Sequence, residues 1–215
     1  MSTKNTTIFV TILIVLAALA GLLFWNRLPD PMASHWDIND QVNGTTGKLA
    51  GVFLLPLISA GMFALFMLIP LIDPLKANIA KFRGVFNIFM LLITAFMVYV
   101  HGLQLAWNLG YGFRMSTALL PAIGLLFIFL GFMIEKTKRN FFIGIRTPWT
   151  LSSDTVWDET HRVGGLLFKL SGLLALVGIF FQGYALWFVL VPAIGSALFT
   201  VIYSYVLFAR EEKAV

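Results

Sequence analysis

Long apolar stretches dominate the chain, and short polar segments separate them. Six stretches each approach 20 residues, which is about the helix length that a bilayer core requires. They cover residues 8–25, 50–72, 84–107, 116–134, 163–182 and 184–209. The pattern therefore predicts six transmembrane helices. The last two stretches almost touch at Gln182 and Gly183, so a tight hairpin is expected there.

The first stretch has the position of a signal peptide but not its usual features. It runs from Ile8 to Trp25, which is longer than a usual signal core. The residues after it, from Asn26 to Asp30, contain no small-x-small cleavage site. We therefore expect a retained first helix.

Consecutive helices are expected to pair, which predicts an all-α membrane protein of three hairpins. The regions are 1–72, with a loop over 26–49, then 73–134 and 135–215. Similar strings around Pro56, Pro121 and Pro192 open the second, fourth and sixth stretches. Proline is common in membrane helices, so both a true repeat and a chance likeness remain open.

Composition supports lipid as the solvent for much of the chain. Hydrophobic residues make up 59% of the sequence and charged residues 12%, against roughly 25% charged residues in soluble domains. That leaves too little polar surface to cover a water-soluble globule. The absence of cysteine excludes disulfides and thiolate metal sites.

The basic residues predict an orientation. With the N-terminus in the cytoplasm, eleven lysines and arginines fall in cytoplasmic segments and three, Arg27, Lys48 and Arg114, in outer segments. Positive residues favour the cytoplasmic side. Both ends of the chain are therefore expected in the cytoplasm, with the loop 26–49 outside and the loop 135–162 inside. The net charge of +5 then reflects inner loops rather than binding to nucleic acid.

The outer loop carries a His-Trp pair with an acidic neighbour. Turn-forming residues surround His35, Trp36 and Asp37, and alternation from residue 32 to residue 36 suggests a short strand. Trp36 fits an interfacial anchor, and no ligand spacing supports a metal site, so we expect none.

A polar face also marks the end of the third stretch. His101, Gln104 and Asn108 lie on one helical face, which we expect to meet the His35–Trp36 loop. Two explanations of this face remain open: ordinary hydrogen bonding between helices, which we favour, and contact with a ligand.

The inner loop concentrates residue types that are costly near a membrane. Ser153 or Asp154 suits the N-cap of a helix that continues into the fifth stretch. Asp158 precedes Arg162 by four residues, which is the favoured order for a helical ion pair. We therefore expect these two side chains to bond.

Two further features of this loop are predicted from spacing. Trp157, His161 and Gly164 share one helical face, so the Trp ring can cover the imidazole. The run Arg146-Thr147-Pro148-Trp149 is expected to be extended, because a residue before proline avoids the helical region. Trp149 and Trp157 are placed at the headgroup level.

Two strings carry a resemblance to a known family. The inner one is Gly144-Ile145-Arg146-Thr147-Pro148-Trp149-Thr150-Leu151-Ser152, followed by Trp157 and by His161-Arg162-x-Gly164. It resembles the signature of the SdpI family, bacterial multi-pass membrane proteins named for immunity against a sporulation-delaying toxin. The outer one runs from Pro29 through His35-Trp36 to Gly44 and resembles a small domain often found at the N-terminus of that family.

The resemblance implies a function that spacing alone does not give. It implies resistance to a secreted peptide toxin, with a receptor role in which a cytoplasmic transcriptional repressor is recruited to the membrane. The implied partners are membrane lipid, the toxin and this repressor, with no cofactor and no direct binding of nucleic acid. Residues 135–215 form the SdpI-like region. The inner residues implied for a partner or for signalling are Arg146, Thr147, Pro148, Trp149, Trp157, Asp158, His161, Arg162 and Gly164. The outer residues expected to contact toxin are His35, Trp36, Asp37, His101 and Gln104.

Three other interpretations remain open. A membrane enzyme could use His161 and Arg162 with nearby carboxylates, but no nucleophile or metal motif accompanies them, so we expect no enzyme. A small transporter is suggested by Lys169, a charge inside the fifth stretch with no evident charged partner. The third interpretation is that the inner motif serves only the architecture of the fifth helix.

Overall fold

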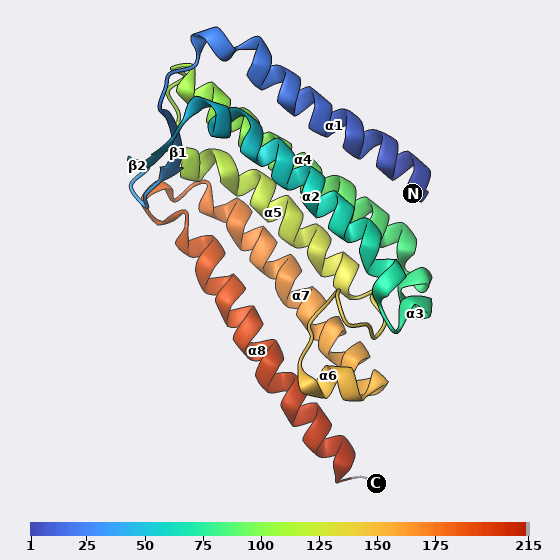
Figure 1. Ribbon diagram of the computed structural model, residues 1–215. Coiled ribbons are helices and arrows are strands. Elements are labelled where there is room, and N and C mark those ends of the chain that lie inside the picture. Colours follow the sequence, from blue (N-terminus) through green and yellow to red (C-terminus); the bar gives the residue numbers. More distant parts are fainter. Residues whose placement is uncertain (214–215) are drawn as a thin grey trace.

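The computed structural model describes residues 1–213, apart from the side chain of Gln182, and most of this chain is helical (Figure 1). Within these residues, six helices are long and apolar enough to cross a membrane. They are α1 Thr3–Leu23, α2 Lys48–Ile72, α4 Arg83–Asn108, α5 Met115–Ile134, α7 Asp154–Gly178 and α8 Trp187–Glu212. The prediction of six membrane helices is confirmed. The three hairpins and the orientation stay predictions.

The helices form a cluster that continues into a row. Helices α1, α2 and α4 pack against one another, α4 also packs on α5, and α5, α7 and α8 follow in file. Figure 1 shows this order from α1 in blue to α8 in red. Helix α4 therefore contacts both the three-helix cluster and the row.

Helices α5 and α7 approach so closely that glycine is required at their contacts. A Cβ atom on Gly131 would lie 2.5 Å from the Gly165 carbonyl oxygen, and one on Gly172 would lie 2.5 Å from the Gly124 carbonyl oxygen. Small residues let membrane helices bring their backbones together in this way. The two contacts are seven residues apart on each helix, which makes α5 and α7 one rigid pair.

The two ends of the bundle differ in structure. At one, here called the hairpin end, strands β1 Met32–Trp36 and β2 Val42–Thr46 pair antiparallel, which confirms the predicted strand. At the other, here called the motif end, lie the short helices α3 Lys76–Lys81 and α6 Pro148–Ser152. The start of α1 and the end of α8 both lie at the motif end (Figure 1).

Helix α7 begins at Asp154, ahead of the apolar stretch that starts at residue 163, which confirms the predicted N-cap. The Ser153 hydroxyl caps the helix by accepting from the Val156 N–H at 3.3 Å. The segment between α2 and α4 folds into α3 and is more than a turn.

The connection from α7 to α8 is wider than the tight hairpin predicted at Gln182 and Gly183. Helix α7 ends at Gly178, a residue of weak helix propensity. The N–H groups of Ile179, Phe180 and Phe181 then bond carbonyls three residues back. This tighter winding leads the chain through the 3₁₀ turn η2 Gln182–Tyr184 before α8 begins.

Candidate functional site

A cavity of about 680 Å³ lies beneath the β1–β2 sheet at the hairpin end. Helix α4 contributes Val100 and Gln104 to its lining, and α5 contributes Met115, Ser116 and Leu119. Helix α2 contributes Ala50, Gly51, Leu54 and Leu55. The sheet supplies the remaining side, with Leu186 at the start of α8. Cavities of this size are common in sites for small ligands. The arrangement is therefore a hollow between membrane helices, roofed by a small sheet.

Hydrogen bonds from α4 hold the first strand in place. The Ala33 N–H donates to the Asn108 Oδ1 at 2.8 Å, and the Asn108 side-chain amide donates to the Ala33 carbonyl at 3.0 Å. The Gln104 side-chain amide donates to the same carbonyl at 3.3 Å. The predicted meeting of this polar face with the outer loop is confirmed for both residues.

His101 lies apart from this meeting point. It is buried, neither ring nitrogen has a hydrogen-bond partner, and it does not line the cavity. The structure thus brings together four of the five residues expected to contact toxin, namely His35, Trp36, Asp37 and Gln104.

The tip of the hairpin is fastened to α5 by Asp40. Its carboxylate accepts from the Ser116 backbone N–H at 2.7 Å and from the Ser116 hydroxyl at 2.8 Å, and pairs with the Arg114 Nε at 2.8 Å. Helix α5 has no side-chain cap from its own Arg114, so Asp40 caps it from a distant loop. Burial acts to raise the pKa of Asp40, but the hydrogen bonds from Ser116 and the charge of Arg114 outweigh it and lower that pKa.

The three predicted hairpin residues have separate local partners. Asp37 accepts from the backbone N–H groups of Asn39 and Gln41, at 2.8 and 2.9 Å, which shapes the turn. The Trp36 ring meets the edge of Trp107 at 5.5 Å between centroids. His35 is exposed, and its Nδ1 bonds the Asn43 side chain. Trp36 is thus anchored on a protein ring, while His35 stays open to a ligand.

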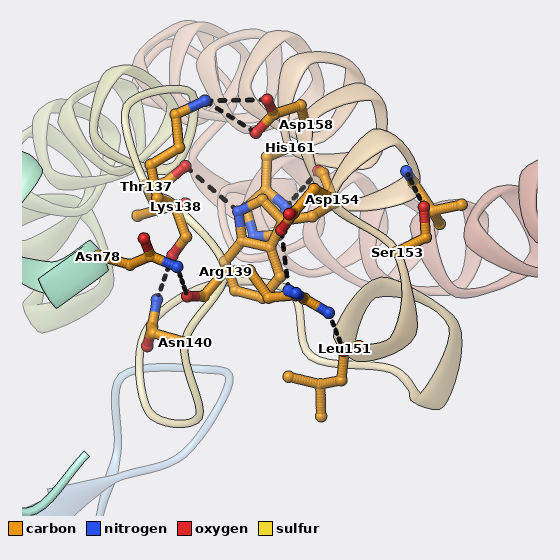
Figure 2. A network of polar contacts seen from close by, with 12 residues as sticks. Asn78, Thr137, Lys138, Arg139, Asn140, Leu151, Ser153, Asp154, Asp158 and His161 are labelled. Atoms are coloured by element: carbon orange, nitrogen blue, oxygen red, sulfur yellow. Dashed lines mark hydrogen bonds and ion pairs between the residues drawn. The ribbon is translucent and has the colours of Figure 1, made fainter. Parts of the chain in front are cut away.

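At the motif end, Trp157 and His161 form the centre of a bonded network. Figure 2 shows His161 within this network. The rings of Trp157 and His161 stack at 4.0 Å between centroids, as predicted. The Trp157 indole donates to the Thr137 carbonyl at 3.2 Å. The His161 Nε2 accepts from the Ile145 N–H at 2.9 Å, and its Nδ1 lies 2.7 Å from the Trp157 carbonyl. The proton therefore lies on Nδ1. Through these two hydrogen bonds the uncharged imidazole links α7 to the inner loop at Ile145, an arrangement here called the His161 bracket.

Gly144 is required by this bracket. Its φ of 120° lies in a region that residues with side chains rarely adopt. A Cβ there would lie 2.4 Å from the His161 Nε2. Glycine thus lets the loop pass directly over the imidazole, so that the next residue, Ile145, can bond it.

Two threonines fix the following short helix. Thr147 caps α6, and its capping partner is Thr150, so each side chain bonds the backbone N–H of the other. The Thr147 hydroxyl also lies 3.0 Å from the Ser204 hydroxyl of α8. The loop is therefore bonded to both α7 and α8.

Arg139 closes the loop from the α5 side. Its guanidinium donates to the Leu151 carbonyl at 3.0 Å and pairs with Asp154 at 2.8 Å (Figure 2). The start of α7 and the end of α6 are thereby held by one side chain.

Several predictions about the inner motif are wrong. Trp157 is fully buried within the protein, so its ring cannot contact lipid headgroups as an interfacial tryptophan would. Asp158 pairs with Lys138 at 2.9 Å, and Arg162 pairs with Glu159 at 2.8 Å, so the expected bond between Asp158 and Arg162 is absent from the described contacts. The cause is the fold of the loop, which brings Lys138 beside α7.

The predicted extended run is also partly wrong. Thr147 is extended, with φ −107° and ψ 163°, but the proline after it starts α6, because proline suits the first helical turn. The rest of the predicted inner set divides by exposure. The buried members are Thr147, Trp157, His161 and Gly164, the exposed members are Arg146, Pro148, Asp158 and Arg162, and Trp149 is half-buried beside Tyr205.

Lys169 has a charged partner after all. Its ammonium lies 2.6 Å from the Glu135 carboxylate of α5 and 4.7 Å from the centre of the Phe132 ring. Glu135 was not predicted as this partner, because it lies 34 residues before Lys169, at the end of another helix. The charge that suggested transport is therefore locally neutralised.

Asp40, Arg139 and Ser204 were also missed. Of the three, only Asp40 carried a signal, since it lies in a loop otherwise assigned to the site. A serine inside an apolar helix gives no warning that it bonds a distant loop.

Comparison with known proteins agrees with this geometry. Residues 136–204 match the family described as the SdpI/YfhL protein family, and 188 residues are 24% identical to the immunity protein SdpI of Bacillus subtilis (strain 168), covering 87% of each chain. The C-terminal part of the chain is therefore similar to the SdpI/YfhL family. The family match contains the whole His161 bracket. Residues 12–60 match a domain of unknown function, DUF1648, which contains the hairpin.

These matches confirm the resemblance on which the functional expectations depend. Together with six helices able to span a bilayer, they make the chain a multi-pass bacterial membrane protein. No solved structure matches the chain.

Proposed function

We propose that this protein confers resistance to a secreted, membrane-active peptide toxin. The observation that carries the proposal is the likeness to an immunity protein across 87% of both chains, which includes the hairpin and the inner motif. The cavity at the hairpin end adds a place where a ligand could be held. The paired Lys169 gives no support to the alternative of transport.

We further propose that the motif end faces the cytoplasm. The segments that carry eleven of the fifteen basic residues lie at that end of the molecule, and basic residues favour the cytoplasmic side. The hairpin end, with His35, Trp36, Asp37 and Gln104 around its cavity, then faces the secreted toxin. Buried His101 supports this end through helix packing.

In a receptor role, the buried residues of the inner motif would hold the loop in place and its exposed residues would bind a partner. Trp157 and His161 hold the loop, while the exposed Arg146 and Arg162 could bind a cytoplasmic repressor. Recruitment on toxin binding requires two states of the protein that differ in toxin affinity. The Thr147–Ser204 bond to α8 is one contact through which such states could differ.

Expression in a toxin-sensitive bacterium tests the resistance function. Cells that make the protein should survive a sporulation-delaying-type peptide that kills cells with the empty vector. Loss of survival despite confirmed membrane insertion would contradict the proposal.

Signalling is tested separately with a repressor-controlled reporter. Arg146→Ala with Arg162→Ala should abolish reporter induction yet leave resistance unchanged, because both side chains are exposed and outside the bracket. Lys213→Ala is the matched control, an exposed basic residue of the same end. Normal induction in the double variant would refute this partner surface.

A further inference from the structure

The hairpin-end cavity changes from polar to apolar with depth. At its mouth are His35, Asp37 and Thr45 from the hairpin. Farther along the helices are Leu54 and Leu55, which lie about 10 Å from the start of α2 at a rise of 1.5 Å per residue. The site therefore offers polar contacts at one level and an apolar slot below it.

Two polar residues of the cavity lining are already held by the protein. Gln104 is 7% exposed, and its side-chain amide donates to the Ala33 carbonyl. The Trp36 indole N–H is buried without a hydrogen-bond partner, and because it has almost no exposed surface it does not face the cavity. The polar contacts open to a ligand therefore come mainly from the other hairpin residues, including exposed His35.

Charge distinguishes between two classes of amphipathic occupant. Among the described residues that line the cavity, the charged side chains are the carboxylates Asp37 and Asp40, and Asp40 is already paired with Arg114. An anionic phospholipid such as phosphatidylglycerol would bring only its phosphate towards these carboxylates and be repelled. A peptide with a lysine, an arginine or a free N-terminus would be attracted by Asp37.

We propose that this cavity binds an amphipathic, cationic peptide segment, with its apolar side chains between α2 and α5 and its positive group at Asp37. The inference rests on the proposed immunity function, for which it specifies the site and the chemical class of the ligand. The site lies between the sheet and the helices α2, α4 and α5. Because α4 also packs on α1, α2 and α5, occupancy contacts the one helix that joins both halves of the bundle.

Filling the cavity provides the direct test. Ala50→Trp and Leu119→Trp place an indole into it from α2 and from α5. Leu57→Trp is the matched control, since Leu57 lies on α2, is 66% exposed and does not line the cavity. The probe is a fluorescent sporulation-delaying-type peptide, and the intact protein is held in nanodiscs of zwitterionic lipid. Each filled variant should weaken binding by at least about tenfold, and the control by less than about twofold.

Asp37→Asn tests the charge. It should weaken binding by about threefold to tenfold at low salt, and the difference from wild type should shrink as salt is added. A free phosphatidylglycerol should compete poorly with the peptide, because its headgroup carries no positive charge. If the lipid displaces the peptide efficiently, or if Asp37→Asn binds as wild type does, the cationic-peptide assignment is wrong.

Survival and binding can fail independently. Wild-type resistance with unaltered binding in both filled variants would overturn the cavity assignment and leave the immunity function standing. Peptide binding that is lost on filling, in a protein that gives no resistance, would support the site and overturn the function.

Discussion

The two ends of the bundle are built in different ways. At the motif end, a loop is bonded to α7 and α8, and apolar side chains including Phe86, Met90 and Ile134 fill the space beside it. At the hairpin end, a sheet of two short strands covers a cavity, and the buried apolar cluster consists of four residues among those described. The close packing of the motif end favours a single conformation, whereas the cavity at the hairpin end has room for a ligand.

The difference also shows in how each end uses polar residues. At the motif end, His161 and Thr147 bond groups of the same loop or of adjacent helices, so little bonding capacity remains. At the hairpin end, His35 stays exposed and Trp36 keeps an unpaired N–H. Substitutions at the motif end should therefore cost stability, and those at the hairpin end should mainly alter binding.

The largest effect is expected at Gly144. Gly144→Ala forces an L-residue to a φ of 120° and pushes a methyl group against His161, so we expect a loss of about 3 kcal/mol in unfolding free energy. Thermal unfolding of the detergent-purified protein, followed by circular dichroism, measures it. Gly195→Ala is the control, because a Cβ there meets nothing within 4 Å. Equal melting of the two variants would show that the bracket is not rigid.

The next largest effect is expected between α5 and α7. Gly172→Ala places a methyl group against the Gly124 carbonyl, which should cost about 1–3 kcal/mol as the two helices separate. Unfolding of the purified protein in sodium dodecyl sulfate is the measurement. Gly61→Ala on α2 has open space and should melt like wild type. No difference between the two would mean that the row of helices tolerates separation.

A smaller effect is expected for the Lys169–Glu135 pair. Both side chains are about a quarter exposed, so their coupling should be near 1 kcal/mol rather than the larger value of a fully buried pair. A double-mutant cycle with Lys169→Met and Glu135→Gln measures it. Additive single effects would show that the pair contributes nothing beyond its separate contacts.

The smallest effect is expected at Asp40 and depends on pH. The fold lowers the pKa of Asp40, so the ionised carboxylate contributes stability that is complete above the unfolded pKa and is lost as the pH falls through the folded pKa. Near neutral pH, Asp40→Asn should be less stable than wild type by roughly 1 kcal/mol. The difference in melting temperature should begin to narrow as the pH falls below the unfolded pKa, near 3.9, and should disappear only below the lower folded pKa. A constant difference would show that the carboxylate charge is irrelevant to the cap.

Local features of both ends could be predicted from the sequence. The lengths of the apolar stretches gave the helices, alternation near Trp36 gave β1, and helical spacing gave the Trp157–His161 stack. The polar face of α4 was also correctly directed towards the hairpin. In each case a period along one element determines the contact.

Contacts between distant elements were the ones that sequence reasoning missed or misassigned. Asp40 reaches Ser116 and Lys169 reaches Glu135 only because the helices pack in a particular order. Asp158 had a suitable partner at four residues, yet the loop offered Lys138 instead. Exposed ion pairs differ by little in energy, so the backbone path decided between these partners.

The cap that Asp40 places on α5 has a consequence for synthesis of the chain. Its partner, the Ser116 N–H, lies 76 residues later in the sequence. The hairpin therefore emerges from the ribosome long before the helix that will secure its tip. The roof cannot be fastened until α5 has been made and inserted, so a chain cut before residue 115 would have the strands without a closed site.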